Sequence, residues 1–402
     1  MRRRWAVARS ITLWVACGAC GPAIPPLPAQ GGPAWRELTS PHITLWTDAS
    51  ADRAHEIVSD AEHLRQVLIG TVFQTVAREG RIIMIALRDL DEYHAYASDR
   101  SGGRMHSASN NLLYQPLIVL PADTPLSSGA RTEAHELCHV LAYALITRQP
   151  RWFAEGLAEY FETIKLDESA GTVELGREPT YQGRPTRIHH LISLPTMFAC
   201  TGEACTNPAF YATAWALFTY LQNAHTAELA QFEQRLAANH DWKAAWSEAF
   251  PGLSINALES DLRVWLTSGS HRLLRYNVKL SDFPVSVRIL GEADIHAIRG
   301  LLAPTPEAEL VEVEAARRIE PTNVLANLLA HVHGHPVTFD AARAIAAAHP
   351  DDWHAWRLVV STASTRDDAA PARDTACRLA AENPAVVPPG GLCDAPTAQV
   401  DR

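Results

Sequence analysis

The chain contains 402 residues, which is more than one compact unit usually holds and indicates two or three domains. Hydrophobic residues make up 47% of the chain and charged residues 20%, so it can bury a substantial core and is not disordered as a whole. With 35 basic against 45 acidic side chains, the formal net charge is -10. Because the net charge is negative and would repel a phosphate backbone, we expect no nucleic-acid partner.

The N-terminal segment has the composition of an export signal. Arginines at positions 2, 3, 4 and 9 precede a short apolar stretch at residues 11–20, and a proline-rich run with small residues follows near Ala29. The unbroken apolar stretch is far shorter than the ~20 residues that a bilayer requires. We therefore expect residues 1–29 to be a signal peptide and the mature protein to be exported, either periplasmic or secreted. A lipid anchor on Cys17 or Cys20 is the alternative, because each follows small residues.

The cysteines that remain after the signal fit an oxidising compartment. Cys200 and Cys205 enclose a turn-forming loop, and Cys377 and Cys393 bracket a segment rich in proline and glycine, so each pair can close a local disulfide. Cys138 lies in a helical apolar pattern and is expected to be a small buried side chain. None of the spacings matches a cysteine zinc site.

The first part of the chain carries strand patterns. Alternating or continuous apolar runs predict strands at residues 42–47, 81–87 and 114–120, and a helical spacing predicts a helix at residues 50–72. A short helix is expected at residues 89–96. Pro116 has no backbone N–H to donate, so we place the third strand at the edge of the sheet.

Helical patterns dominate after residue 128. The apolar spacing predicts helices at residues 128–147, 152–164, 211–224, 227–238 and 257–267. Strands come first and helices follow, so residues 35–270 are expected to form one α+β domain.

The remaining segment, residues 271–402, is rich in alanine and is expected to be all-helical. Pro321, Pro350 and Pro384 each end an alanine-rich helix, at intervals of 29 and 34 residues, which is near the period of two-helix repeats. The segment resembles a degenerate tetratricopeptide array that could dock a protein partner. Irregular helices packed on the first domain are the alternative interpretation.

The sequence His135-Glu136-Leu137-Cys138-His139 carries the most specific chemical signal. In a helix, residues four apart lie on one face, so both imidazoles can reach the same metal ion while Glu136 points beside them. Neutral imidazole suits zinc, and a zinc site that performs chemistry needs a third protein ligand and an open position for water.

A third ligand is available on the next predicted helix, in the sequence Pro150-Arg-Trp-Phe-Ala-Glu-Gly-Leu-Ala-Glu-Tyr-Phe161. The proline break allows the chain to return along the first helix and present Glu155 to the metal, with fifteen residues between His139 and Glu155. Gly156 would allow a close approach between helices. Glu159 lies one turn after Glu155, and we expect it to accept the remaining ring N–H of a ligand histidine.

These residues resemble the gluzincin metallopeptidases, the group that contains thermolysin and the aminopeptidase N and leukotriene-hydrolase families. The resemblance rests on His-Glu-x-x-His followed by Trp-x-x-Glu-Gly-x-Ala, and it covers residues 110–225. It implies a zincin-like fold, a Zn²⁺ cofactor held by His135, His139 and Glu155, and a peptide or protein substrate. The helix that begins at Tyr211 is similar to the one that carries the transition-state tyrosine in the aminopeptidase-type families.

Two departures from those families affect the expected substrate. Thr213-Ala214 stands where Lys-Gly usually follows the tyrosine, and no segment from residue 35 to residue 134 reproduces the Gly-x-Met-Glu-Asn sequence that holds a free N-terminus. Gly103-Arg-Met-His106 is not an equivalent. Aminopeptidase specificity is therefore not implied.

The expected mechanism is hydrolysis of a peptide bond by a metal-activated water. Glu136 would act as general base and then pass the proton to the leaving amine, and Tyr211 would donate a hydrogen bond to the oxyanion. The strand around residues 117–120 would pair with an extended peptide.

Simpler interpretations accompany these assignments. Glu159 can be an ordinary exposed carboxylate and Tyr211 a core aromatic. The histidines at 189–190 and at 331, 333 and 335 are more simply solvated loop residues than metal ligands. For the whole protein, the alternative to an exported zinc peptidase is a binding protein that keeps the zincin fold and works through its helical C-terminal region.

Overall fold

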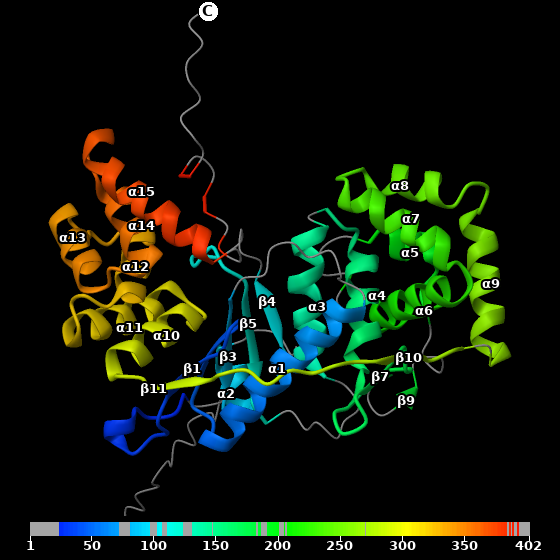
Figure 1. The fold of residues 1–402 in the computed structure, drawn as a ribbon, viewed down its shortest axis with the longest axis horizontal. Coiled ribbons are helices and arrows are strands. Elements are labelled where there is room, and N and C mark those ends of the chain that lie inside the picture. Colours follow the sequence, from blue (N-terminus) through cyan, green and yellow to red (C-terminus); the bar gives the residue numbers. More distant parts are fainter. Residues whose placement is uncertain are drawn as a thin grey trace, which may run out of the picture.

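A computed structural model of the chain describes residues 24–71, 81–96, 103–106, 111–123, 131–146, 148–181, 184–185, 191–200, 205, 207–269, 271–383, 386, 388–389 and 392–393. It has a mixed α/β architecture with a helical C-terminal region (Figure 1). The predicted signal peptide and the alternative lipid sites at Cys17 and Cys20 lie outside the described residues.

A six-stranded mixed sheet lies at the centre of the molecule. The strand order is β11-β1-β2-β3-β5-β4, in which β2, β3 and β5 run parallel and the remaining pairs are antiparallel. The strands are β1 (Arg36–Thr39), β2 (Ile43–Thr47), β3 (Ile82–Leu87), β4 (Arg104–His106), β5 (Leu117–Pro121) and β11 (Ser286–Ile289). The continuous apolar run of β3 is buried at all six positions, as expected for the centre of a sheet that is covered on both faces.

The two faces of the sheet bury different cores. On one face, α1 (Ala51–Thr71) and α3 (Thr132–Leu145) pack on alternate strand residues such as Leu45, Met84 and Ile118. On the other face, α2 (Leu90–Tyr96) and α10 (Glu292–Leu302) pack on Ile83, Ile85 and Val119. Figure 1 shows the sheet between the C-terminal helices on one side and helices α3 to α9 on the other. The predicted strands at 42–47 and 81–87 and the helices at 50–72 and 89–96 are therefore confirmed.

The predicted position of the third strand is wrong. β5 lies between β3 and β4, and the edge strand is β4, which is too short for its pattern to predict. Pro116 does not prevent this arrangement because it precedes β5 and uses only its carbonyl, which accepts a hydrogen bond from Ile83 N at 2.9 Å.

A helical layer follows the sheet in the chain. It contains α3, α4 (Arg151–Glu162), α5 (Leu194–Phe198), α6 (Pro208–Ala224), α7 (Thr226–Ala237), α8 (Trp242–Ala249) and α9 (Ile255–Ser268). The predicted helices of this region are confirmed, whereas α5 and α8 were not predicted. Small strands flank the layer: β6 (Lys165–Asp167), β7 (Thr172–Leu175) and β10 (Leu274–Asn277) form one sheet, and β8 (Thr180–Tyr181) pairs with β9 (Arg184–Pro185).

The chain after residue 270 returns to the sheets before it becomes helical. β10 pairs with β7 and β11 pairs with β1, so residues 271–291 contribute strands where helices were expected. The helical region then consists of α10, α11 (Pro306–Ile319), α12 (Val324–Val332), α13 (Phe339–Ala348), α14 (Trp353–Thr362) and α15 (Arg366–Glu382). Pro321 and Pro350 lie in the breaks before α12 and α14, as the repeat interpretation expects, and the likeness to tetratricopeptide repeats stays a prediction.

Both predicted disulfides are present. Cys200 and Cys205 are bonded with their Cα atoms 5.7 Å apart, and Cys377 and Cys393 with theirs 5.4 Å apart. Cys138 is a free and fully buried thiol, also as predicted. Among the described residues, no helix combines the length and the apolar composition needed to cross a membrane.

Candidate metal centre

Helix α3 places the two histidines of the motif on one face. Its apolar residues Ala134, Leu137 and Cys138 are buried in the core, which fixes the rotation of the helix. His135 and His139 then lie one turn apart, with ring centroids 4.8 Å apart and their Nε2 atoms separated by 3.1 Å. Both rings therefore present the same nitrogen to the same point.

Helix α4 brings Glu155 to that point. The helix begins directly after Pro150 and is anchored by Trp152 and Phe153, both of which are buried in an aromatic cluster. Glu155 Oε2 lies 3.5 Å from His135 Nε2 and 3.4 Å from His139 Nε2. The break at Pro150 therefore has the consequence that the sequence predicted: the second helix returns to the histidines.

The three atoms fit a metal ion of the size of zinc. His135, His139 and Glu155 form one of two groups of potential ligands among the described residues. Their distances of 3.1, 3.4 and 3.5 Å define a nearly equilateral triangle whose centre is about 1.9 Å from each atom, close to the ~2.0–2.2 Å of zinc bonds to nitrogen and oxygen. Their side chains are 13%, 11% and 12% exposed, so the centre is shielded but still open to solvent. The donor set thus suits zinc with a free position.

A second carboxylate orients His135. Glu162 Oε2 lies 3.0 Å from His135 Nδ1, so an N–H on Nδ1 donates to Glu162 and leaves the Nε2 lone pair directed at the centre. We expected this contact from Glu159. Glu159 is buried and belongs to the second group of potential ligands, with His135 and Glu162, and its assigned role stays a prediction.

Glu136 lies near the residue that precedes the edge strand β4. It is 7% exposed, and the histidines and Glu155 are among the charges that act on it. A Cβ atom on Gly103, the residue before β4, would lie 3.4 Å from Glu136 Oε1 and 2.5 Å from Thr132 Cγ2. A Cβ atom here would therefore clash with the Thr132 methyl group, and the glycine lets the chain before the edge strand pass close to α3 beside the expected general base.

Gly156 makes a close contact with a helix other than the one expected. A Cβ atom on Gly156 would lie 2.5 Å from the carbonyl oxygen of Ala214, so the glycine allows α4 to approach α6. Helix α6 begins at Pro208, where the side chain of Asn207 accepts a hydrogen bond from Phe210 N. As a result, Tyr211 in the first turns of α6 lies close enough to interact with Glu155, Arg151 and His135.

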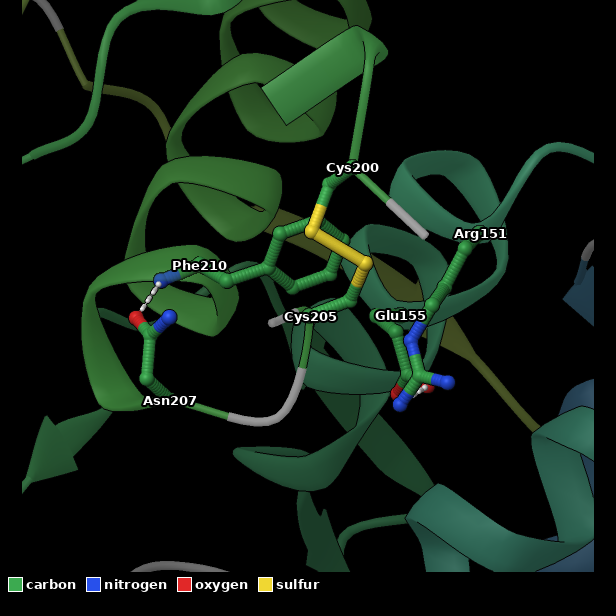
Figure 2. Close-up of a disulfide and its surroundings, with 6 residues drawn as sticks. All are labelled: Arg151, Glu155, Cys200, Cys205, Asn207 and Phe210. Atoms are coloured by element: carbon green, nitrogen blue, oxygen red, sulfur yellow. Dashed lines mark hydrogen bonds and ion pairs between the residues drawn. A yellow bond between two sulfur atoms is a disulfide. The ribbon is translucent and has the colours of Figure 1, made fainter. Parts of the chain in front are cut away.

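Arg151 adds a positive charge at the same place. Its Nη2 atom lies 3.4 Å from Glu155 Oε1, the oxygen that is not directed at the histidines, and its positive charge is near enough to act on the pKa of Tyr211. Figure 2 shows the Arg151 guanidinium over the Glu155 carboxylate, beside the Cys200–Cys205 disulfide. Tyr143, one turn after His139, also interacts with Glu155 and Arg151 and is 38% exposed.

The electrostatics of the cluster follow from burial and from these pairs. Burial opposes the charge on His135, but hydrogen bonds to Glu155 and Glu162 raise the pKa of its imidazole well above the ordinary value. Burial likewise opposes the charge on Glu155, but hydrogen bonds to His135 and His139 lower the pKa of its carboxyl. Burial raises the pKa of Glu136, which favours a carboxyl that can exchange a proton. Burial and the charge on Glu155 also raise the pKa of Tyr211, which favours the protonated phenol.

Sequence reasoning missed four residues around the centre, namely Gly103, Tyr143, Arg151 and Glu162. A signal existed for the last three, because each lies four or seven residues from a predicted ligand and therefore on the same helix face. Histidines 331, 333 and 335 do not form a group of three potential ligands among the described residues, whereas residues 189–190 lie outside them. Cavities of about 340 and 330 Å³ lie on the opposite face of the sheet, against α10.

One family model matches the segment that contains this centre. The model of a family described as "Protein of unknown function (DUF1570)" matches residues 130–241, which include α3, α4 and α6 and thus every predicted ligand and Tyr211. No curated protein and no solved structure matches the chain.

Proposed function

We propose that the protein is a zinc-dependent peptidase with a zincin-like catalytic region. The observation that carries the proposal is the triangle of His135 Nε2, His139 Nε2 and Glu155 Oε2, which has the dimensions of a three-ligand zinc site. Structural zinc sites have four protein ligands, whereas catalytic sites keep one position open. Three converging ligands with a buried glutamate beside them favour the catalytic kind.

Each residue of the proposed site would have a separate role in hydrolysis. When bound, zinc would supply a Lewis acid that acidifies water and polarises a carbonyl group. Glu162 holds His135 in the tautomer that leaves Nε2 free. The Glu136 carboxylate would take a proton from the attacking water and deliver it to the leaving nitrogen. The Tyr211 hydroxyl would donate to the oxygen of the tetrahedral centre.

The edge strand supplies a place for the substrate. β4 lies at one edge of the sheet, and Gly103, the residue before it, lies close to Glu136. An extended peptide added along β4 would bring its backbone past the general base, because strand addition uses the main-chain groups of an edge strand. This position replaces the one first expected at residues 117–120.

We also propose that the protein works outside the cytoplasm. Two local disulfides persist in an oxidising compartment, and the N-terminal segment has the composition of an export signal. Replacing both cysteines of one pair and expressing the chain in a reducing cytoplasm would test whether the bonds are needed for stability.

The experiment for the peptidase is metal analysis followed by cleavage profiling. The purified protein should contain one zinc per chain, and His139→Ala should lose it. The native protein should cleave members of a mixed peptide library, and a chelator should stop the cleavage. Glu136→Gln should retain zinc and lose cleavage, because the amide cannot accept the proton. Zinc without cleavage across the library would instead favour the binding-protein alternative, in which the helical region docks a partner.

A further inference from the structure

Helix α4 begins with a residue that is unfavourable for a helix N-terminus. Arg151 occupies the first helical position, where the macrodipole disfavours a positive charge, and Pro150 offers no side-chain cap. Local rules broken in this way tend to mark functional positions.

The contacts of Arg151 leave most of its donors free for another group. A guanidinium carries five N–H donors in a planar fork. The described contact is one ion pair to Glu155 at 3.4 Å, Tyr211 is near enough to feel the positive charge, and 41% of the side chain is exposed. The Arg151 guanidinium therefore lies at the solvent side of the centre, near both Glu155, the proposed third ligand, and Tyr211, the proposed donor to the oxyanion.

The charges around the centre make this cation important for an anionic ligand. Four carboxylates, those of Glu136, Glu155, Glu159 and Glu162, surround the two histidines in the described part of the chain. Arg151 is the cation that the described ion pairs place on this cluster. A carboxylate on a substrate would meet acidic groups on the other sides; apart from the proposed zinc itself, the cation that the described ion pairs place there is Arg151, whose planar guanidinium can pair with it in a bidentate way.

We propose that Arg151 determines specificity by binding a carboxylate of the substrate next to the scissile bond. The inference rests on the proposed peptidase function and adds a substrate class to it: peptides that place a carboxylate beside the metal centre. That carboxylate is either the free C-terminus or an acidic side chain, and the two sources share the same chemistry at the guanidinium.

Equilibrium binding to the Glu136→Gln full-length protein, loaded with zinc, tests the inference without any turnover. The probes are three dansylated hexapeptide pools: one without Asp or Glu and with a free C-terminal carboxylate, the same pool with a C-terminal amide, and an amidated pool that contains Asp and Glu. Charge-assisted pairs of this kind are worth about tenfold or more in affinity. We expect at least one carboxylate-bearing pool to bind about tenfold more tightly than the neutral amidated pool, and Glu136→Gln/Arg151→Met to lose that preference.

Controls separate recognition from a purely structural role. Arg148→Met removes a neighbouring exposed cation and should keep the preference, whereas Arg151→Lys should keep part of it as a point charge. Zinc affinity by chelator competition is measured for each variant. If Arg151→Met weakens binding of all three pools equally, or only lowers zinc affinity, Arg151 merely positions Glu155 and the inference is refuted. Failure of the native protein to cleave peptides would refute the proposed function while leaving this binding comparison decisive for Arg151.

Discussion

The close contact between α4 and α6 gives a quantitative prediction for Gly156→Ala. The added Cβ would lie 2.5 Å from Ala214 O and 3.0 Å from both Ala214 C and Phe218 Cβ. Two of these three atoms are backbone, so no side-chain rotation can relieve the clash and the helices must separate by roughly 1 Å. Overpacking of this kind costs about 1–3 kcal/mol. Because the clash is mainly with backbone, we take the upper part of that range, about 2–3 kcal/mol. The better helix propensity of alanine returns about 1 kcal/mol, so we expect a net loss of about 1–2 kcal/mol.

Thermal unfolding followed by circular dichroism measures this loss. For a domain of this size 1 kcal/mol corresponds to about 2–4 °C in Tm, so the variant should melt about 2–8 °C below the native protein. Gly70→Ala is the matched control, because nothing lies within 4 Å of its added Cβ and the same propensity gain should leave Tm unchanged or higher. All three proposed ligands lie on α3 and α4, so zinc content should survive, whereas cleavage should fall because Tyr211 moves away from Glu155. A Gly156→Ala protein with native Tm and native cleavage would refute the packing argument.

Three further outcomes are expected. Glu162→Gln should weaken zinc binding 10–100-fold in a chelator competition, because the orienting charge on His135 is lost, whereas Glu168→Gln, which removes a comparable carboxylate 3.0 Å from His63, should not change it. Gly103→Ala should lower cleavage and keep zinc, because the new Cβ meets Thr132 Cγ2 at 2.5 Å and the chain before the edge strand must shift. Adding Thr132→Ala removes that atom and should restore activity, and no rescue would contradict the proposed role of the edge strand. Burial and the neighbouring Asp48 raise the pKa of Glu92 from 4.5 to about 8. Between these pH values the folded state keeps a proton that the unfolded state releases. The free energy of unfolding should therefore decrease as pH rises from 5 to 8. Denaturant titrations at pH 5, 6.5 and 8 should show that the free energy of unfolding of Glu92→Gln depends less on pH than that of the native protein. Glu62→Gln is the control, because hydrogen bonds from His42 and Ser40 outweigh burial and lower the pKa of the Glu62 carboxyl. This variant should be less stable at every pH and should keep the native pH dependence.

The elements that the sequence predicted well are those whose burial is set by local periodicity. β3 is buried on both faces and α1 on one, and each pattern is long enough to identify the element and its limits. β4 has three residues, and β6 to β9 have two to four, so no period can be recognised in them. The strands of the later chain were missed for a further reason, because β10 and β11 are fixed by pairing with distant strands, as when β11 joins β1 across some 250 residues.

The same distinction explains the candidate centre. His135, His139 and Glu155 were predictable because a fixed spacing on one helix, followed by a helix break, brings them together through local geometry alone. The prediction that Pro116 marks an edge strand was wrong. A proline is excluded from the interior of a sheet only at a position where its missing N–H would form a hydrogen bond. Here Pro116 stands just before β5 and only its carbonyl accepts a hydrogen bond from the neighbouring strand. Gly103 could not be identified as a site residue, since its significance lies in a contact with Thr132 and Glu136 on a helix that begins some thirty residues later.

The helix-face argument extends beyond the ligands and links the parts of the centre. On α4, Arg151, Glu155, Glu159 and Glu162 follow one another at intervals of three and four, so a single stripe of the helix carries the proposed substrate-side cation, the proposed metal ligand and the carboxylate that contacts His135. The opposite face carries Trp152 and Phe153 into the aromatic core. A rotation of α4 about its axis would therefore misplace all the polar groups together, and the core packing that prevents it is as much a determinant of the chemistry as the ligands are. This coupling explains why a glycine that touches no ligand, Gly156, is expected to affect cleavage.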